Sequence, residues 1–238
     1  MSCSRSGLRM NPDEAITEVR QRIAVAAQRS GRSADAVRLI AVSKRQSITA
    51  IEALIACGQK DFGENQMQEA VDKIGVLHNP SLEWHFIGHL QSNKTRHVGA
   101  NFSWVHTVDS AKLARRIAAS AAQAGRVVRL LLQVNVSADP AKHGIEQEAL
   151  FPLIDSLCEE QLASIRLRGL MTIGRRGAGE ADTRATFISL RNLLEQCRQR
   201  FGDSFSELSM GMSGDLELAI EEGATMVRVG TALFGHRE

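Results

Sequence analysis

Residues 38–58, RLIAVSKRQSITAIEALIACG, read as one buried β-strand followed by one amphipathic α-helix. The four apolar residues 39–42 are typical of a strand that is covered on both faces, as in a parallel sheet. Ser47 suits the N-cap of a helix, apolar residues recur at helical spacing over 47–57, and Gly58 suits the position after the helix. This stretch therefore predicts a βα unit.

The same strand-then-helix unit recurs along the chain. Strands are predicted at 38–44, 61–65, 83–88, 104–108, 129–135, 167–173, 207–212 and 226–231, and helices between them at 47–57, 65–76, 91–99, 110–124, 146–159, 182–200 and 214–222. Eight strands that alternate with helices predict an α/β protein with a single (β/α)8 TIM barrel. Asn11-Pro12 predicts the start of an extra N-terminal helix over 12–29, which would cover the barrel near the last strand.

The composition is that of an ordinary globular protein. The chain has 238 residues, of which 43% are hydrophobic and 24% charged, which suits one large domain. We expect a disordered N-terminal tail over 1–10 and a barrel domain over 11–238. A net charge of +2 does not predict a nucleic-acid surface.

The cysteines and the apolar runs indicate a cellular compartment. The four cysteines form no CxxC pair and no zinc spacing, as expected of reduced thiols in the cytosol. No apolar run approaches the roughly 18 residues of a membrane span. The first ten residues lack the apolar stretch of a signal peptide. The sequence therefore predicts a cytoplasmic protein that does not bind a membrane.

Lys44 is the first residue that suggests chemistry. It ends the first predicted strand, and active sites of TIM barrels lie at the carboxyl ends of the strands. Poor solvation lowers the pKa of a lysine, and a free amine can attack an aldehyde to form an imine. From position alone, a lysine that extends to solvent without a chemical role is the more common case.

The ends of the last two predicted strands suggest a phosphate site. Residues 209–214, SMGMSG, lead from the seventh strand towards a helix, and residues 228–231, RVGT, end the eighth. Glycines let backbone N–H groups approach an anion, and barrels often bind phosphate after strands seven and eight. Ordinary turns would explain either loop alone. Together with Lys44 on the far side of the barrel, these loops suit a ligand that carries both an aldehyde and a phosphate.

Seven segments carry a resemblance to a known family. They are AVSK (41–44), FGEN (62–65), WHFIGHLQSNK (84–94), LLQVNVS (131–137), LRGLMTIG (167–174), SMGMSGDLELAI (209–220) and VRVGTALFG (227–235). From about residue 13 to residue 235, the chain resembles the pyridoxal phosphate homeostasis proteins (YggS-like). The resemblance implies a barrel similar to the N-terminal domain of alanine racemase. It also implies a protein that binds, buffers and delivers pyridoxal 5'-phosphate (PLP) without established catalytic turnover.

The resemblance also implies the site residues. Lys44 would hold PLP as a covalent aldimine, and Arg228 would face the pyridine nitrogen. The residues implied around the phosphate are Ser209, Met210, Gly211, Ser213, Gly230 and Thr231, and those implied along the ring and the bottom of the pocket are Asn65, His85 and Met171. The chain departs from the family in one place: members commonly carry a tyrosine after FGEN, where this chain has Gln66, so the contact of that tyrosine cannot be carried over.

A PLP-dependent amino-acid racemase or lyase of low activity is the alternative. Racemisation needs a second base, which in alanine racemase is a tyrosine of a second domain, and this chain contains no tyrosine. Arg228 stays protonated, so it does not let the pyridine nitrogen keep a proton of its own, which weakens the cofactor as an electron sink. The racemase tolerates an arginine at this position, so Arg228 disfavours an enzyme, and the racemase or lyase stays open as the alternative. A third hypothesis is an interaction module in which PLP serves only as a ligand signal.

Several further residues have side chains that could serve in chemistry. Lys142, in the loop after the fifth strand, is hypothesised to accept PLP transiently, although an exposed loop lysine is the simpler explanation. His85 and His89 are four residues apart without a carboxylate that would complete a metal site. Glu64 is interpreted as a packing or salt-bridge residue. We expect a monomer whose partners are PLP and apo forms of PLP-dependent enzymes.

Overall fold

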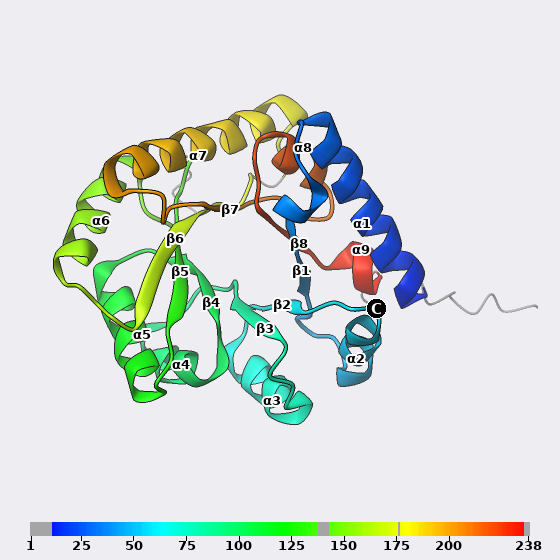
Figure 1. Ribbon diagram of the computed structural model, residues 1–238, viewed down its shortest axis with the longest axis horizontal. Helices are drawn as coiled ribbons and strands as arrows, with labels where there is room; N and C mark the ends of the chain where they lie inside the picture. The colour runs from blue at the N-terminus through cyan, green and yellow to red at the C-terminus, as the bar shows by residue number, and fades with distance from the viewer. Residues whose placement is uncertain (1–10, 138–142, 176, 236–238) are drawn as a thin grey trace, which may run out of the picture.

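The structure, a computed structural model, describes residues 11–137, 143–175 and 177–235. Eight parallel strands close into one barrel, in which each strand pairs with the next in sequence and β8 pairs with β1 (Figure 1). The strands are β1 (Arg38–Val42), β2 (Asp61–Glu64), β3 (Glu83–Phe86), β4 (Trp104–Val108), β5 (Val128–Gln133), β6 (Ile165–Met171), β7 (Glu207–Ser209) and β8 (Met226–Val229). The predicted TIM barrel is therefore confirmed. The predictions for residues 1–10 and for Lys142 concern residues outside those that the structure describes.

Helices cover the outside of the barrel. They are α1 (Pro12–Arg29), α2 (Ile48–Ala56), α3 (Met67–Leu77), α4 (Val98–Asn101), α5 (Ala111–Gln123), α6 (Leu150–Glu159), α7 (Glu180–Phe201), α8 (Leu216–Glu221) and α9 (Thr231–Phe234), with 3₁₀ turns η1 (Ala34–Ala36), η2 (Ser92–His97) and η3 (Gln147–Ala149). The predicted cap is present: the side chain of Ser47 accepts from the N–H of Ala50. At the start of α5, the side chain of Ser110 accepts from the N–H of Leu113 in the same way.

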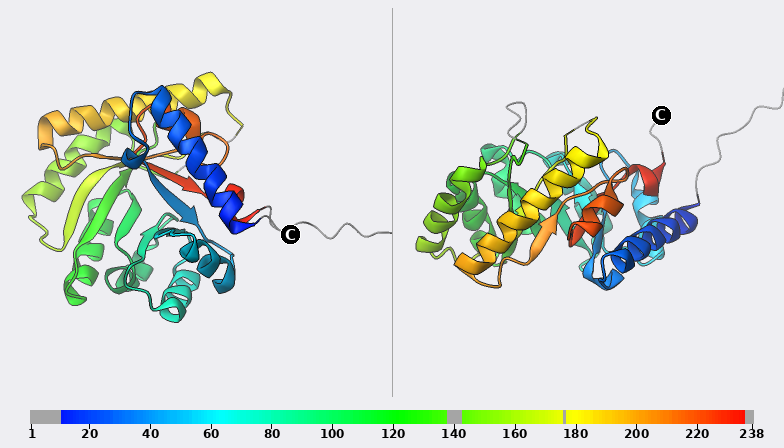
Figure 2. Two further views of the ribbon diagram at one scale, coloured as in Figure 1. Left: turned by 45° about the vertical axis from the view of Figure 1, so that its right-hand side comes forward. Right: turned by 90° about the horizontal axis from the view of Figure 1, so that it is seen from above.

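The extra N-terminal helix begins where the sequence predicts. The side chain of Asn11 caps α1, and Pro12 occupies the first turn. The helix packs against α8, α9 and α2, and so covers the seam where β8 meets β1 (Figures 1 and 2). Arg22 of α1 contacts α8 and the loop before it. Its guanidinium lies 2.6 Å from the carboxylate of Glu217 and donates to the carbonyl oxygen of Ser213 over 2.9 Å.

Most of the predicted strands run too far at their carboxyl ends. Lys44 lies in a turn after β1 instead of ending the strand, and Thr231 begins α9 instead of ending β8. The predicted helix 91–99 is a 3₁₀ turn, η2, followed by the short helix α4. The chain leaves the ladder early because the residues at these ends turn towards the mouth of the barrel, which apolar patterning alone does not reveal.

The apolar core has two parts. The larger part fills the space between the strands and the surrounding helices, as expected for strands buried on both faces. The smaller part lies inside the barrel and consists of Ile40, Trp104, Leu131, Met171 and Met226. Buried polar side chains share this interior, and they lead to the candidate site.

Candidate functional site

Three of the expected site residues come from three neighbouring strands. Because all eight strands are parallel, their carboxyl ends meet at one end of the barrel. Lys44 lies just after β1, Asn65 directly follows β2, and Gly230 directly follows β8. Since β1 pairs with both β2 and β8, these residues lie on adjacent strand ends.

Gly230 shows how close the end of β8 comes to β1. A Cβ atom at Gly230 would lie 3.4 Å from the carbonyl oxygen of Val42 and 3.5 Å from its Cβ. The expectation that the loops after β7 and β8 face Lys44 from the far side of the barrel is therefore wrong. The barrel closes between β8 and β1, so the last loop lies beside Lys44.

Lys44 sits in a tight turn. The backbone N–H of Gln46 donates to the carbonyl oxygen of Ser43 over 3.0 Å, which leaves Lys44 and Arg45 in the middle of the turn. Arg45 has a φ of 60°, as in the third position of a type II turn, which glycine prefers. A left-handed conformation costs an ordinary residue about 1–2 kcal/mol. The backbone next to Lys44 is therefore strained, and other contacts must hold it.

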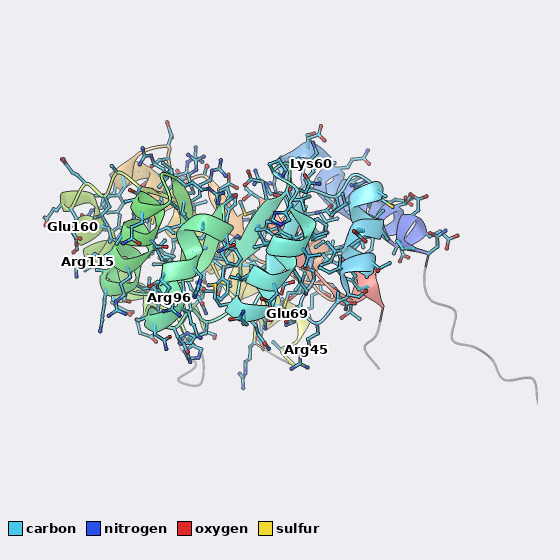
Figure 3. All side chains as sticks on the ribbon, turned by 90° about the horizontal axis from the view of Figure 1, so that it is seen from below. Arg45, Lys60, Glu69, Arg96, Arg115 and Glu160 are labelled. Atoms are coloured by element: carbon cyan, nitrogen blue, oxygen red, sulfur yellow. The ribbon has the colours of Figure 1, made fainter. Side chains whose placement is uncertain are left out.

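Lys73 and Glu69 of α3 supply those contacts. Lys73 Nζ donates to the carbonyl oxygen of Ser43 over 2.6 Å and to the carboxylate of Glu69 over 2.6 Å. The same carboxylate accepts a hydrogen bond from the backbone N–H of Arg45, which lies beside Glu69 in Figure 3. One ion pair thus holds the backbone on both sides of Lys44.

Glu64, the last residue of β2, completes this cluster. It is fully buried and accepts from Ser43 Oγ over 2.7 Å and from Lys73 Nζ over 2.8 Å. Burial raises the pKa of Glu64, and the bonds from Lys73 and Ser43 oppose that rise. The interpretation of Glu64 as a salt-bridge residue is confirmed. Lys73 was missed, although its spacing of four residues from Glu69 was a signal for an ion pair.

The loop after β7 is shaped by Gly211. Its φ is 87°, and a Cβ atom there would lie 2.5 Å from the Cβ of Ala219, so the loop excludes any larger residue. The carbonyl oxygen of Gly211 accepts from the backbone N–H of Arg228 over 3.0 Å. Two residues further on, Ser213 Oγ accepts a long bond of 3.5 Å from the N–H of Ala232. The loop after β7 therefore lies against the start of α9, where Thr231 is exposed.

Arg228 and Ser209 lie inside the barrel. Arg228 is 5% exposed; its Nη1 donates to Ser209 Oγ over 2.7 Å, and its Nη2 donates to the carbonyl oxygen of Thr172 over 3.0 Å. Burial lowers the pKa of Arg228 to about 10, partly offset by the charge of Asp215, so the guanidinium stays protonated at neutral pH. It is a cation with a fixed orientation.

His85, the third residue of β3, is fully buried inside the barrel. Its Nε2 lies 3.0 Å from Asp61 Oδ1, and its Nδ1 lies 3.0 Å from His106 Nε2. Burial lowers the pKa of His85 and, more strongly, that of His106. Both nitrogens of His85 are thus used within the protein, and its link towards Ser209 runs through His106, which was not among the expected site residues.

The two expected methionines lie in different parts of the core. Met171, the last residue of β6, packs inside the barrel with Ile40 and Trp104. Met210 is also fully buried, but it belongs to the core between the strands and the helices. The side chain of Met171 therefore points into the barrel, whereas that of Met210 points outwards, towards the helices.

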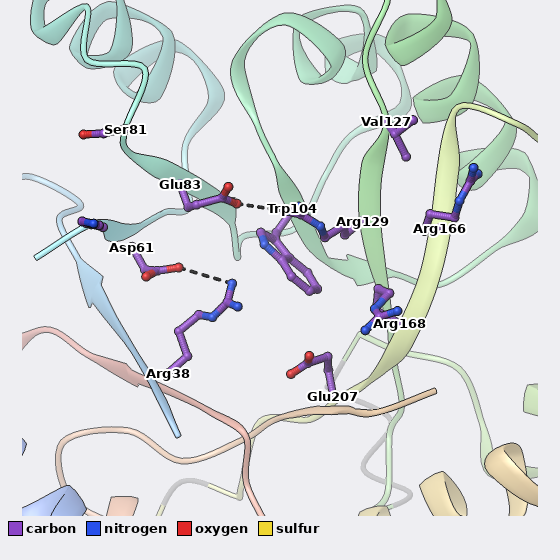
Figure 4. A pocket seen from close by; sticks show the side chains of 11 residues that line it. Arg38, Asp61, Ser81, Glu83, Trp104, Val127, Arg129, Arg166, Arg168 and Glu207 are labelled. Carbon is purple, nitrogen blue, oxygen red and sulfur yellow. Dashed lines mark hydrogen bonds and ion pairs between the residues drawn. The ribbon is translucent and has the colours of Figure 1, made fainter. Parts of the chain in front are cut away.

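A cavity of about 590 Å³ lies at the other, amino-terminal end of the barrel. It is lined mainly by charged residues, including Arg38, Asp61, Glu83 and Arg129, with Trp104 at its inner wall (Figure 4). Arg38 and Arg129 lie about 5.3 and 5.2 Å from the centre of the Trp104 ring. This cavity holds none of the expected site residues.

The described residues form neither a metal cluster nor a membrane-spanning helix. Within the described ranges, no group of three or more His, Cys, Asp or Glu side chains is placed to hold a metal ion. None of the helices described is long and apolar enough to cross a bilayer.

Comparison with known proteins identifies the family. The model for the N-terminal domain of alanine racemase matches residues 16–238. A pyridoxal phosphate homeostasis protein of Pseudomonas aeruginosa is 45% identical over 225 residues, covering 94% of this chain and 95% of that protein. The corresponding protein of Escherichia coli is 41% identical over 229 residues, with the same shares covered. The chain belongs to the pyridoxal phosphate homeostasis protein family.

Solved structures agree with this membership. PipY of Synechococcus elongatus, solved with PLP bound, is 39% identical with a TM-score of 0.83, covering 94% of this chain and all of that one. The alanine racemase of Corynebacterium glutamicum is 18% identical with a TM-score of 0.66, covering 94% of this chain and 61% of that one. The likeness to the racemase concerns the fold alone.

The residues at the carboxyl ends fit the chemistry of PLP. Lys44 supplies an amine, Ser213 and Thr231 supply hydroxyls, and Arg228 supplies a fixed cation. Asn65 Oδ1 is buried without a hydrogen-bond partner among the described residues, and such an atom usually pairs with a ligand or water. The donor set therefore suits a small molecule with an aldehyde, a phosphate and a ring nitrogen.

Proposed function

We propose that this chain binds PLP at the carboxyl ends of β1, β2, β7 and β8 through a Schiff base with Lys44. The amine nitrogen of Lys44 bonds to the aldehyde carbon, and the aldehyde oxygen leaves as water. One observation supports this proposal above all: the turn that contains Lys44 lies beside the loop at Gly230 and Thr231, at one end of the barrel. In PLP the aldehyde and the phosphate arm are on neighbouring ring carbons, so an amine beside a phosphate loop suits it.

The other expected residues have assigned places in this proposal. Ser213, Gly230 and Thr231 surround the phosphate, together with the backbone of Met210 and Gly211, and Ser209 supports the site through its bond to Arg228. Arg228 faces the pyridine nitrogen. Asn65 and Met171 line the ring, and His85 acts from below through His106.

We further infer that the protein holds PLP reversibly, as a buffer that delivers it to apo-enzymes in the cytoplasm, and that it acts as a monomer. The relatives carry the name of homeostasis proteins, which supports this role. Arg228 leaves the pyridine nitrogen without a proton, which disfavours carbanion chemistry and supports storage over turnover. A racemase or lyase of low activity is the competing function.

Binding is tested with two lysine variants. Lys44→Ala should lose the absorbance band that wild type develops with PLP, while Lys60→Ala should keep it. Lys60 is an exposed lysine at the other end of the barrel (Figure 3), so it controls for the loss of a charge. A band that survives in Lys44→Ala overturns the proposal.

Turnover is tested separately. The loaded protein is incubated with each amino acid in heavy water, and exchange of the α-proton is followed by NMR. No exchange above that of free PLP is expected, and turnover with any amino acid would establish the enzymatic alternative. A pull-down that depends on PLP occupancy would support the third reading, an interaction module.

A further inference from the structure

A continuous chain of hydrogen bonds crosses the interior of the barrel from β2 to β8. It runs from Asp61 Oδ1 to His85 Nε2 (3.0 Å) and from His85 Nδ1 to His106 Nε2 (3.0 Å). It continues from His106 Nδ1 to Ser209 Oγ (2.8 Å) and from Ser209 Oγ to Arg228 Nη1 (2.7 Å). The two rings and the hydroxyl are fully buried, so solvent does not interrupt the chain.

The two ends of the chain have fixed hydrogen-bonding roles. A guanidinium can only donate, and a carboxylate can only accept. Because Arg228 donates to Ser209 Oγ, the hydroxyl proton is available for His106 Nδ1. His106 then carries its proton on Nε2 and donates to His85 Nδ1. His85 in turn carries its proton on Nε2 and donates to Asp61, so every proton is used once.

The reverse arrangement needs one more proton. If His106 donated from Nδ1 to Ser209, its Nε2 would have to accept from His85 Nδ1. His85 would then need a second proton on Nε2 to face the carboxylate of Asp61, and it would become a buried cation. Burial lowers the pKa of both rings, and the charge of Arg228 lowers that of His106 further. Both rings are therefore neutral at neutral pH, with their protons on Nε2.

We propose that Asp61, His85 and His106 are positioning residues that hold Arg228 towards the ring nitrogen of PLP. This inference rests on the proposed function, in which Arg228 faces that nitrogen. Ser209 Oγ and the carbonyl oxygen of Thr172 bind the two terminal nitrogens of Arg228, so the guanidinium cannot turn away. Through this chain, a carboxylate in the amino-terminal cavity sets the position of a group at the cofactor site.

The first test needs no cofactor. In apo-protein labelled with ¹⁵N-histidine, multiple-bond NMR assigns the proton of each ring. His85 and His106, assigned by loss of their signals in His85→Leu and His106→Leu, should both be neutral at pH 7 with the proton on Nε2. A proton on Nδ1 of either ring, or a cationic ring, would overturn the inference whether or not the protein binds PLP.

The second test concerns the loaded protein. His106→Leu removes both bonds of the central ring. The PLP dissociation constant should rise about tenfold in His106→Leu, as expected for the loss of support for a charged hydrogen bond. The pH midpoint of the absorbance of bound PLP should also shift in His106→Leu, which a general loss of stability would not cause.

The control for this test is His78→Asn. His78 is exposed with a φ of 40°, a conformation that asparagine tolerates. It should behave as wild type. If His106→Leu is folded by circular dichroism and binds PLP with an unchanged affinity and spectrum, the positioning role is disproved. If wild type itself does not bind PLP, the proposed function fails while the ring assignments still stand or fall by the apo-protein spectrum.

Discussion

Lys73 Nζ lies 2.6 Å from the carbonyl oxygen of Ser43, so a buried ammonium fixes the residue that precedes Lys44. Lys73 is 6% exposed and also pairs with Glu64 and Glu69. The chain thus uses one lysine to hold the backbone that presents another. Lys73 and Glu64 are both buried. Removing one of them leaves the other as an unpaired buried charge, which lowers the free energy of unfolding.

Lys73→Met should therefore destabilise the fold by about 3 kcal/mol, because it leaves the buried carboxylate of Glu64 without its cation. PLP binding should weaken as well, since the strained turn at Arg45 loses its anchor. Urea denaturation and PLP titration measure the two effects. Lys60→Met, at an exposed lysine, should change stability by less than about 0.5 kcal/mol. Equal stability of the two variants would show that the cluster does not hold the turn.

Gly88→Ala should disturb the site from the side of β3. A Cβ atom at Gly88 would lie 2.2 Å from the backbone oxygen of Asn65, so Asn65 must move. We expect a loss of about 2 kcal/mol in stability and weaker PLP binding. Gly75→Ala is the control, because nothing lies within 4 Å of its Cβ position in α3, and alanine favours a helix by about 0.5–1 kcal/mol. Unchanged PLP affinity in Gly88→Ala would exclude Asn65 from the site.

The buried histidines predict a pH dependence of stability. Burial holds the pKa values of His85 and His106 below the ordinary value of 6.5. As the pH falls below about 6.5, the unfolded chain binds protons that the folded protein does not. Stability should therefore fall by up to about 1.4 kcal/mol per pH unit and per ring, until the pH reaches the folded pKa values. Urea denaturation from pH 7 to pH 5 measures this slope.

The control for this dependence is a histidine variant outside the barrel. In His106→Leu, the free energy of unfolding should fall less steeply with falling pH, because one buried ring is missing. In His78→Asn, the contributions of both buried rings to this slope should remain. An identical slope in wild type and His106→Leu would contradict the assignment of His106 as a neutral buried ring.

The pair between Arg22 and Glu217 predicts a second, weaker pH effect. The hydrogen bond from Arg22 lowers the pKa of Glu217 below 4.5, so the pair stabilises the fold above that pH and is lost as the pH falls through the lowered value. Both side chains are about a third exposed, which limits the gain to about 1 kcal/mol. Denaturation of Arg22→Ala should show this deficit at pH 7 and less of it near pH 3.5. A deficit that grows at low pH would contradict the pair.

The sequence was sufficient for the fold because apolar runs and caps repeat with the βα period. Eight strands, the helix over 12–29 and the cap at Ser47 followed from local patterns. The positions of the strand ends did not follow from these patterns. Lys44 and Thr231 lie outside the hydrogen-bonded ladder, and this depends on the closed barrel and not on the apolar pattern. The closure between β8 and β1 also places the phosphate loop beside Lys44, which a linear pattern cannot indicate.

The buried polar network inside the barrel was the part of the structure that the sequence predicted least. His106 and Asp61 lie 45 residues apart on different strands, and only the barrel joins them through His85. Lys73 lies on a helix whose pattern marks it as a surface residue, yet its ammonium donates to oxygens of Ser43, Glu64 and Glu69. The family resemblance names Lys44, Arg228 and Ser209. It does not name Lys73, which holds the turn before Lys44, or His106, which binds Ser209.

Borohydride reduction of the PLP-loaded protein, followed by peptide mapping, locates the lysine that forms the Schiff base. Reduction converts an imine into a stable amine, so the lysine that held PLP keeps the added mass. We expect the adduct on the peptide that contains Lys44, and none on the peptide with Lys73. An adduct confined to another lysine, or no adduct in a protein that was saturated with PLP, would contradict this expectation.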